Sequence, residues 1–435
     1  MKSVAAFVTF FIVCLMTVWS SGCLGPIGKE PVTPLPTPQV ETTGAGGPVG
    51  VTGNAVVDAN NRFALDAYGR LSKDPAYGKG NLFFSPFSIS SALSITNEGA
   101  RGTTADEIQS VFHFPKDDAT RRGGFQQLYQ GINQGNARYT LRTANALWAE
   151  QTYPFLPGYM QAAREYYSAN ATNMDFKTQA EASRLAINGW VEDQTNNRIR
   201  DLIPQGVIDS LTRLVITNAV YFKGMWGEQF DANRTKDDRF TTVPGTTVPV
   251  RMMTRTDTFS YMETDSVQVL GMPYASDGGK QLSMVVLLPK GNDLAPLEDS
   301  LTVQKLQELR NGLMNKTVEV HFPKFKLETK YSLPATLAAM GMPTAFTDRA
   351  DFSGMDGTKS LYIGDVIHQA FVEVNEEGTE AAAATAVVVM VGMAMDHHEP
   401  PPIPVFRADH PFLFLIQDDD TGNILFLGRV MDPNG

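Results

Sequence analysis

The sequence predicts an α+β fold with large, mostly antiparallel sheets. Runs rich in β-branched and aromatic residues, which are typical of strands, occur at 142–148, 214–222, 282–288, 318–325, 368–374 and 424–427. Helical spacing of apolar residues occurs between several of these runs, at 157–167, 180–196, 302–313 and 333–340. Because strands and helices are mixed without regular alternation, and no internal repeat is present, the pattern favours the α+β class.

The first elements of the folded part are helical. Apolar residues at 54–72 have helical spacing, and a short apolar run from residue 81 turns into a second helix that continues over 88–97. Pro86 suits the first turn of that helix. Thr103, Thr104 and Glu107 predict the capped start of a third helix.

The composition is that of a folded protein. The chain has 435 residues, of which 43% are hydrophobic and 19% charged, so a sizeable core can form. No linker-like break follows residue 54, and residues 54–435 are therefore predicted to be one domain.

Charge and cysteine content exclude several classes of function. The net charge is −11 and no stretch is dominated by Lys or Arg, so a nucleic-acid partner is not expected. Both cysteines, Cys14 and Cys23, lie before the folded part, which therefore has no disulfide, no cysteine zinc site and no cysteine nucleophile.

The N-terminus is predicted to be a secretory signal over residues 1–22. Lys2 precedes an apolar run at 4–18, which is shorter than the roughly 20 residues that span a bilayer. Residues 20–23 resemble a prokaryotic lipobox, in which Cys23 becomes the lipidated first residue, although Ser20 departs from the usual aliphatic residue. The alternative is a plain signal peptide with an incidental Cys23.

Residues 23–53 are predicted to be an extended tether. They are rich in Pro, Gly and Thr and have too few large apolar side chains to pack. With the signal, this tether predicts a secreted protein, either extracellular or anchored to the cell surface by a lipid.

Local motifs of the common enzymes are absent from the chain. We find no Gly-x-Ser-x-Gly elbow, His-Glu-x-x-His motif, phosphate-binding loop or dinucleotide fingerprint. The densest group of metal-capable side chains is at 396–399. Adjacent residues in an extended chain point to alternate sides, so we expect a solvated loop tip and no metal.

The most informative segment is 373–406. Read with period two from Thr379, one face is uncharged and carries only small or β-branched residues, at 379, 381, 383, 385, 387, 389 and 391. Such a segment could enter a sheet with this face buried and Glu380 in water. Two alternatives are an alanine-rich helix followed by a core strand, and an aggregation-prone run at 387–391.

Several ordered motifs over residues 54–433 resemble the serpin family. Residues 374–386 resemble the hinge of inhibitory serpins, and 406–416 resemble the C-terminal signature. Residues 81–108 are similar to the serpin helix that begins at the shutter. This resemblance implies a serpin fold, with a large central sheet, additional sheets, about eight or nine helices and an exposed reactive loop at about 376–405.

The resemblance also implies roles for individual residues. The reactive bond, counted from the hinge, would join Gly392 to Met393. Met390, Val391, Met393 and Met395 are alternative positions if the frame differs. The hinge residues would be Glu376, Gly378, Thr379, Glu380, Ala381, Ala382, Ala383, Ala384 and Thr385. Residues of the shutter and breach, which control opening of the sheet, would be Ser85, Ser88, Asn218, Trp226 and His368.

The function implied by the resemblance is inhibition of serine proteases, and also of cysteine proteases, by suicide-substrate trapping. The apolar residues around the reactive bond fit elastase-, subtilisin- or chymotrypsin-like targets. We expect a monomer that needs no cofactor and meets a membrane only through an N-terminal lipid. The alternative is a non-inhibitory serpin that acts as a surface binding or chaperone-like protein.

Overall fold

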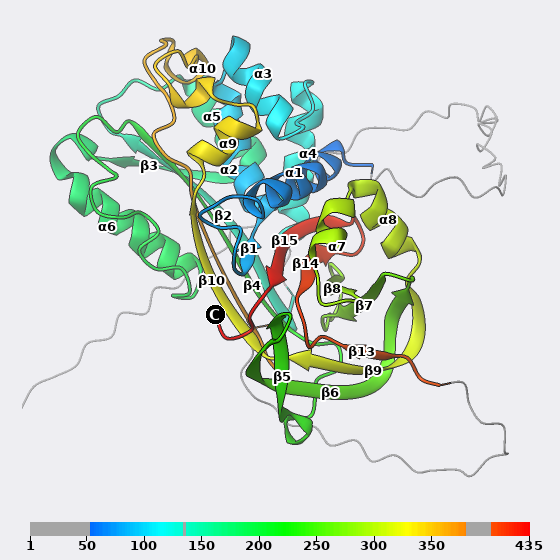
Figure 1. Ribbon diagram of the computed structural model, residues 1–435. Helices are drawn as coiled ribbons and strands as arrows, with labels where there is room; N and C mark the ends of the chain where they lie inside the picture. Colours follow the sequence, from blue (N-terminus) through cyan, green and yellow to red (C-terminus); the bar gives the residue numbers. More distant parts are fainter. Residues whose placement is uncertain (1–52, 134–135, 380–401) are drawn as a thin grey trace, which may run out of the picture. The chain divides into compact units, whose positions relative to one another are not determined.

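The computed structural model describes residues 53–133, 136–379 and 402–435 (Figure 1). Residues 50–435 form one compact unit. The predicted signal, Cys23, the tether, the hinge residues from Glu380 onward and the Gly392–Met393 bond lie outside the described residues.

The first sheet has six strands and includes the predicted strands at 142–148, 214–222 and 368–374. All its pairs are antiparallel except that between β2 and β3. In spatial order its strands are β10 (Phe325–Ser332), β11 (Ile367–Val374), β12 (Gly378–Thr379), β4 (Leu214–Met225), β2 (Tyr139–Glu150) and β3 (Ala169–Met174).

A second sheet has nine strands, of which β5 (Lys236–Val243) pairs with β6 off the main path. Every residue of β8, β14 and β15 is buried, as expected for strands covered on both faces. The path runs through β1 (Leu82–Phe84), β15 (Asn423–Val430), β14 (Phe412–Asp418), β8 (Leu282–Pro289), β7 (Val267–Pro273), β6 (Thr246–Glu263), β9 (Met314–Pro323) and β13 (Val405–Arg407).

The described residues contain ten α-helices, slightly more than the eight or nine expected, and two short 3-10 helices, Ala232–Arg234 and Thr344–Phe346. The α-helices are α1 (Ala55–Leu71), α2 (Pro86–Gly99), α3 (Gly102–Val111), α4 (Asp118–Ile132), α5 (Pro157–Tyr167), α6 (Phe176–Gln194), α7 (Ala295–Ser300), α8 (Val303–Asn311), α9 (Pro334–Met340) and α10 (Ser353–Asp356).

The starts of α1 and α2 follow the local sequence. The Asn54 side chain accepts a hydrogen bond from the Val56 amide, and the Ser85 hydroxyl accepts one from the Ser88 amide. Each bond satisfies an amide that the first helical turn leaves without a partner. Pro86 lies in the first turn of α2, as predicted.

The capped start predicted for the third helix was wrong. Helix α3 begins at Gly102, and its N-cap Arg101 makes no side-chain capping bond. The Glu107 carboxylate instead accepts hydrogen bonds from the amide and hydroxyl of Thr344, and the Thr104 hydroxyl accepts one from the Asp351 amide. These partners are distant in sequence, so the local pattern could not show them.

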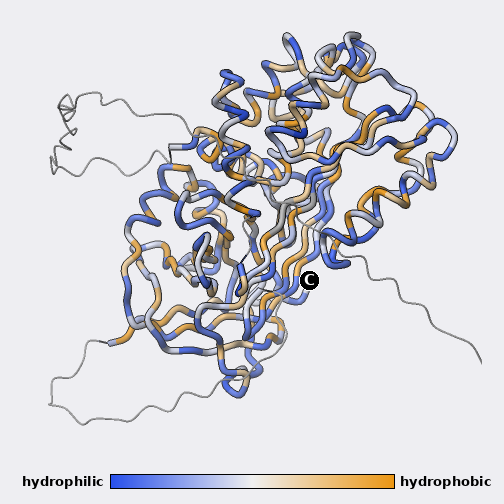
Figure 2. Tube along the Cα trace, turned by 180° about the vertical axis from the view of Figure 1, so that it is seen from behind, coloured by the Kyte–Doolittle hydropathy of each residue, from blue (hydrophilic) through white to orange (hydrophobic). Residues whose placement is uncertain are grey.

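Two apolar clusters hold the unit together, and apolar residues follow the strands through its middle (Figure 2). The larger cluster includes residues of both sheets and of α1, α2, α4 and α5. The smaller one joins Phe176 and Ile187 of α6 to Ala146 and Trp148 of β2. Helix α6 therefore packs on one face of the six-stranded sheet, while α2 and α5 belong to the core on the other. No helix within the described ranges is long and apolar enough to cross a membrane.

Candidate functional site

The short strand β12 lies between β11 and β4. Gly378 pairs with Met225, and Thr379 pairs with Gly224 on one side and with Val374 on the other. Within the described part of the chain, β11 and β4 do not pair with each other directly. Among the described residues, Gly378 and Thr379 are therefore the ones that join the two strands, and they lie at one end of the line along which β11 and β4 do not pair. We call residues 375–377, which lead into β12, the hinge turn.

Gly378 occupies a position that only glycine fits. Its φ is +155°, and a Cβ added there would lie 2.1 Å from the carbonyl oxygen of Gly224. Because backbone atoms cannot yield to such a contact, any side chain would push β12 away from β4. The glycine thus permits the close approach that brings the next residue into the sheet.

Thr379 points into the core. Its side chain is 2% exposed, and its hydroxyl shares a 2.7 Å hydrogen bond with the hydroxyl of Tyr274. The Tyr274 ring stacks on Trp226 at 4.9 Å, and the Trp226 indole donates to the carbonyl of Asn375 at 3.0 Å. The face predicted to be buried on insertion therefore begins at Thr379 with a buried side chain.

An ion pair holds the chain just before β12. The Glu376 carboxylate accepts hydrogen bonds from the Lys324 ammonium at 2.7 Å and from the Thr235 hydroxyl at 2.8 Å. Burial opposes ionisation of Glu376, but these two partners outweigh it and lower the pKa of Glu376. The carboxylate is therefore charged at neutral pH and fixes the hinge turn to the residues immediately before β10 and β5.

The predicted shutter residues Ser85, Ser88 and His368 lie together. The Nε2 atom of His368 accepts a 3.0 Å hydrogen bond from the Ser85 amide. The Ser85 hydroxyl donates to the carbonyl of Leu425 at 2.7 Å and accepts from the Ser88 amide at 3.1 Å. His368 is 7% exposed, and burial lowers its pKa to about 3, so its ring is neutral and can accept.

Asn218 lies on β4 and His368 on β11. The two residues are therefore on opposite sides of the line along which β4 and β11 do not pair, which we call the unpaired line. Asn218 Nδ2 donates to Asn145 Oδ1 at 2.6 Å, and Asn145 Nδ2 donates to the Tyr167 carbonyl at 2.6 Å. Asn218 Oδ1 is buried and has no hydrogen-bond partner among the described residues. Leaving a buried acceptor without a hydrogen bond costs free energy. A hydrogen-bond donor brought next to Asn218 Oδ1 would therefore be stabilised there.

The structure brings three of the five predicted shutter and breach residues together. Ser85, Ser88 and His368 meet at the start of α2, whereas Trp226 contacts the hinge turn and Asn218 contacts Asn145 on β2. Sequence reasoning missed other members of the site, whose positions carry no local motif: Thr235, Tyr274, Lys324, Asn145 and Tyr167. The metal-capable segment 396–399 lies outside the described residues, and no group of three metal-capable side chains that could hold an ion is found among the residues that are described.

Comparison with known proteins identifies the family. Residues 58–433 match the family model for serpin (serine protease inhibitor). The leukocyte elastase inhibitor of Bos taurus is 43% identical over 385 residues, which cover 86% of this chain and 98% of that protein. An uncharacterised serpin-like protein of Thermococcus kodakarensis is 40% identical and covers 98% of this chain and 99% of its own length. The chain therefore belongs to the serpin family.

Solved structures agree with this assignment. Uncleaved ovalbumin superposes with a TM-score of 0.77 at 32% identity, covering 87% of this chain and all of that one. A cleaved, loop-inserted ovalbumin mutant gives a TM-score of 0.76 at 32% identity, with the same coverage. Since both forms fit equally well, the global fold does not distinguish a protein before loop insertion from one after it.

The buried His368 predicts an acid-sensitive fold. Between about pH 6.5, where an unfolded histidine titrates, and pH 3, the unfolded chain binds a proton that the folded chain does not. This stabilisation is complete above about pH 6.5 and is lost as the pH falls, by up to about 1.4 kcal/mol per unit. In thermal unfolding, we expect lowering the pH from 7 to 5 to reduce the melting temperature less in His368→Gln than in wild type. An equal reduction would contradict this.

Proposed function

We propose that this serpin inhibits serine proteases by suicide-substrate trapping, with its cleaved loop inserting as a full strand between β11 and β4. The observation that carries this proposal is β12, which already pairs with both strands at one end of their unpaired line. The small residues after Thr379 in the sequence support it, since none of them blocks entry into the sheet. The similarity to leukocyte elastase inhibitor supports a protease target.

The covalent step would proceed at the reactive bond. The protease serine hydroxyl attacks the Gly392 carbonyl and forms an ester, while its proton passes to the departing amide nitrogen of Met393. The loop is then cut but still attached to the protease through this ester. Insertion of the hinge side would carry the protease away from its productive geometry before water hydrolyses the ester.

The register of β12 specifies where the inserted residues would lie. The Thr379 pairs with Gly224 and Val374, continued residue for residue, would place Thr385 opposite both Asn218 and His368. A threonine hydroxyl there could donate to the unpartnered Oδ1 of Asn218. Residues 376–392 number 17, about 55 Å when extended, whereas β4 has 12 residues, so the loop is long enough to pair along all of β4.

Incubation with an elastase-like serine protease tests the proposal. We expect a complex that resists SDS, released fragment masses that place the cut after Gly392, and a cleaved inhibitor that melts at a higher temperature than the intact one. Cleavage that yields neither a complex nor a gain in melting temperature would contradict trapping. That result would favour the alternative, a non-inhibitory binding protein. Human thyroxine-binding globulin, whose name states that it binds a ligand, has a similar fold.

Thr379→Arg should convert the inhibitor into a substrate. Thr379 is already buried against Tyr274 in β12, so an arginine there would lose its hydration whenever β12 pairs in the sheet and would oppose entry of the strand that continues from it. We expect the inhibitor consumed per protease inactivated to rise at least tenfold. The matched control Glu380→Arg lies on the face predicted to remain in water and should trap normally. Equal trapping by both variants would argue against strand insertion.

We further propose that Cys23 carries a lipid and that the mature protein is held at the cell surface as a monomer. The support is the small-residue segment before Cys23, at the end of the apolar run. Expressed in a bacterium that processes lipoproteins, the wild-type protein should partition with membranes, and Cys23→Ala should appear in the soluble fraction. Membrane association that is unchanged in Cys23→Ala would exclude this anchor.

A further inference from the structure

Helix α2 is connected to the six-stranded sheet at both ends, directly at its start and through Tyr167 of α5 at its end. At its start, the Ser85 amide donates to His368 of β11. The adjoining β1 adds a second tie, because the amide of Phe83 donates to the hydroxyl of Tyr331 on β10 at 3.2 Å. The half of the sheet formed by β10 and β11 is thus fixed to the beginning of α2.

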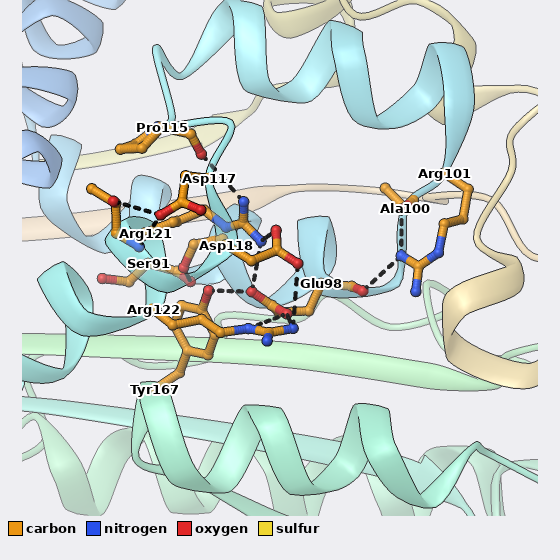
Figure 3. A network of polar contacts seen from close by, with 12 residues as sticks. Ser91, Glu98, Ala100, Arg101, Pro115, Asp117, Asp118, Arg121, Arg122 and Tyr167 are labelled. Atoms are coloured by element: carbon orange, nitrogen blue, oxygen red, sulfur yellow. Dashed lines mark hydrogen bonds and ion pairs between the residues drawn. The ribbon is translucent and has the colours of Figure 1, made fainter.

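The end of α2 holds a buried carboxylate, Glu98, whose side chain is 1% exposed (Figure 3). Its Oε1 accepts hydrogen bonds from the Tyr167 hydroxyl at 2.6 Å and from Arg121 at 2.9 Å, and its Oε2 accepts one from Arg122 at 2.6 Å. Burial opposes ionisation of Glu98, but these donors outweigh it and lower its pKa. The carboxylate is therefore a fixed, charged acceptor for Tyr167.

Tyr167 links Glu98 to the other half of the sheet, which contains β2 and β4. It ends α5, and its backbone carbonyl accepts from Asn145 of β2 at 2.6 Å. The side chain of Asn145 in turn accepts from Asn218 of β4 at 2.6 Å. Asn218 borders the unpaired line, so a chain of hydrogen bonds runs from the end of α2 to the strand that the loop would pair with.

We propose that Glu98 and Tyr167 are positioning residues that set the spacing between β4 and β11, and thereby the barrier to loop insertion. The inference rests on the proposed trapping function. A helix is stiff along its axis, so α2 fixes the distance between its two tied ends. While both ties hold, β4 and β11 keep their spacing. The tie through Tyr167 is given up when a complete strand enters, and releasing it early lets the uncut loop insert.

Tyr167→Phe removes the tie with little other change. The ring, packed 5.4 Å from that of Phe125, is kept, and the ion pairs of Glu98 with Arg121 and Arg122 remain. Tyr159→Phe is the matched control. Tyr159 is also a buried residue of α5, and its hydroxyl has no hydrogen-bond partner among the described residues.

The experiment compares the uncut full-length variants during incubation at raised temperature. Conversion to the loop-inserted form is followed by native gel mobility and by loss of protease trapping. We expect Tyr167→Phe to convert about tenfold faster than Tyr159→Phe, a ratio that corresponds to about 1.4 kcal/mol. Tyr167→Phe should lower the melting temperature of the intact form but leave that of the cleaved form equal to the control's.

Three outcomes separate the possibilities. Equal conversion rates in the two variants would overturn the inference. Equal loss of melting temperature in the intact and cleaved forms of Tyr167→Phe would also overturn it, since a purely structural bond acts in both forms. If wild type itself traps no protease, the proposed function fails instead. Should Tyr167→Phe not fold, Asn145→Ala breaks the same chain one link further on and must give the same acceleration.

Discussion

The line between β4 and β11 is the feature on which the rest of this structure depends. Two neighbouring strands of one sheet do not pair directly, and among the described residues only Gly378 and Thr379 join them. A strand edge that no neighbouring strand covers can accept another strand. The candidate site is therefore made of backbone groups of β4 and β11, and the side chains described above surround it.

The charge states of the side chains near this line depend on both their burial and their hydrogen-bond partners. His368 accepts a hydrogen bond only because burial keeps its ring neutral, whereas Glu376 and Glu98 remain charged because cationic partners outweigh their burial. Three buried side-chain oxygens near the line and the hinge turn have no hydrogen-bond partner among the described residues: Asn218 Oδ1, Gln369 Oε1 and Glu377 Oε2. In the proposed mechanism, Asn218 Oδ1 lies where an inserted strand would pass.

Helix α2 links the contacts of His368 with those of Tyr167, because Ser85 at its start bonds to one and Glu98 at its end bonds to the other. His368 lies on β11, and the carbonyl of Tyr167 accepts from Asn145 of β2, so in our proposal a displacement of either half of the sheet is resisted by the same rigid element. Apolar packing alone would not achieve this, because it is not directional and allows strands to slide. Directional bonds to the ends of one helix define a spacing.

Local pattern determined much of this protein. Helical spacing and Pro86 predicted α1 and α2 within a few residues, because side-chain periodicity and the fixed backbone angle of proline are short-range effects. Alternation after Thr379 predicted which face is buried at that residue. Only the tertiary structure assigned Glu107 to Thr344 instead of a cap, and Tyr167 to both Glu98 and Asn145. Such partners are fixed by how helices and strands pack, and nothing in the neighbouring sequence encodes them.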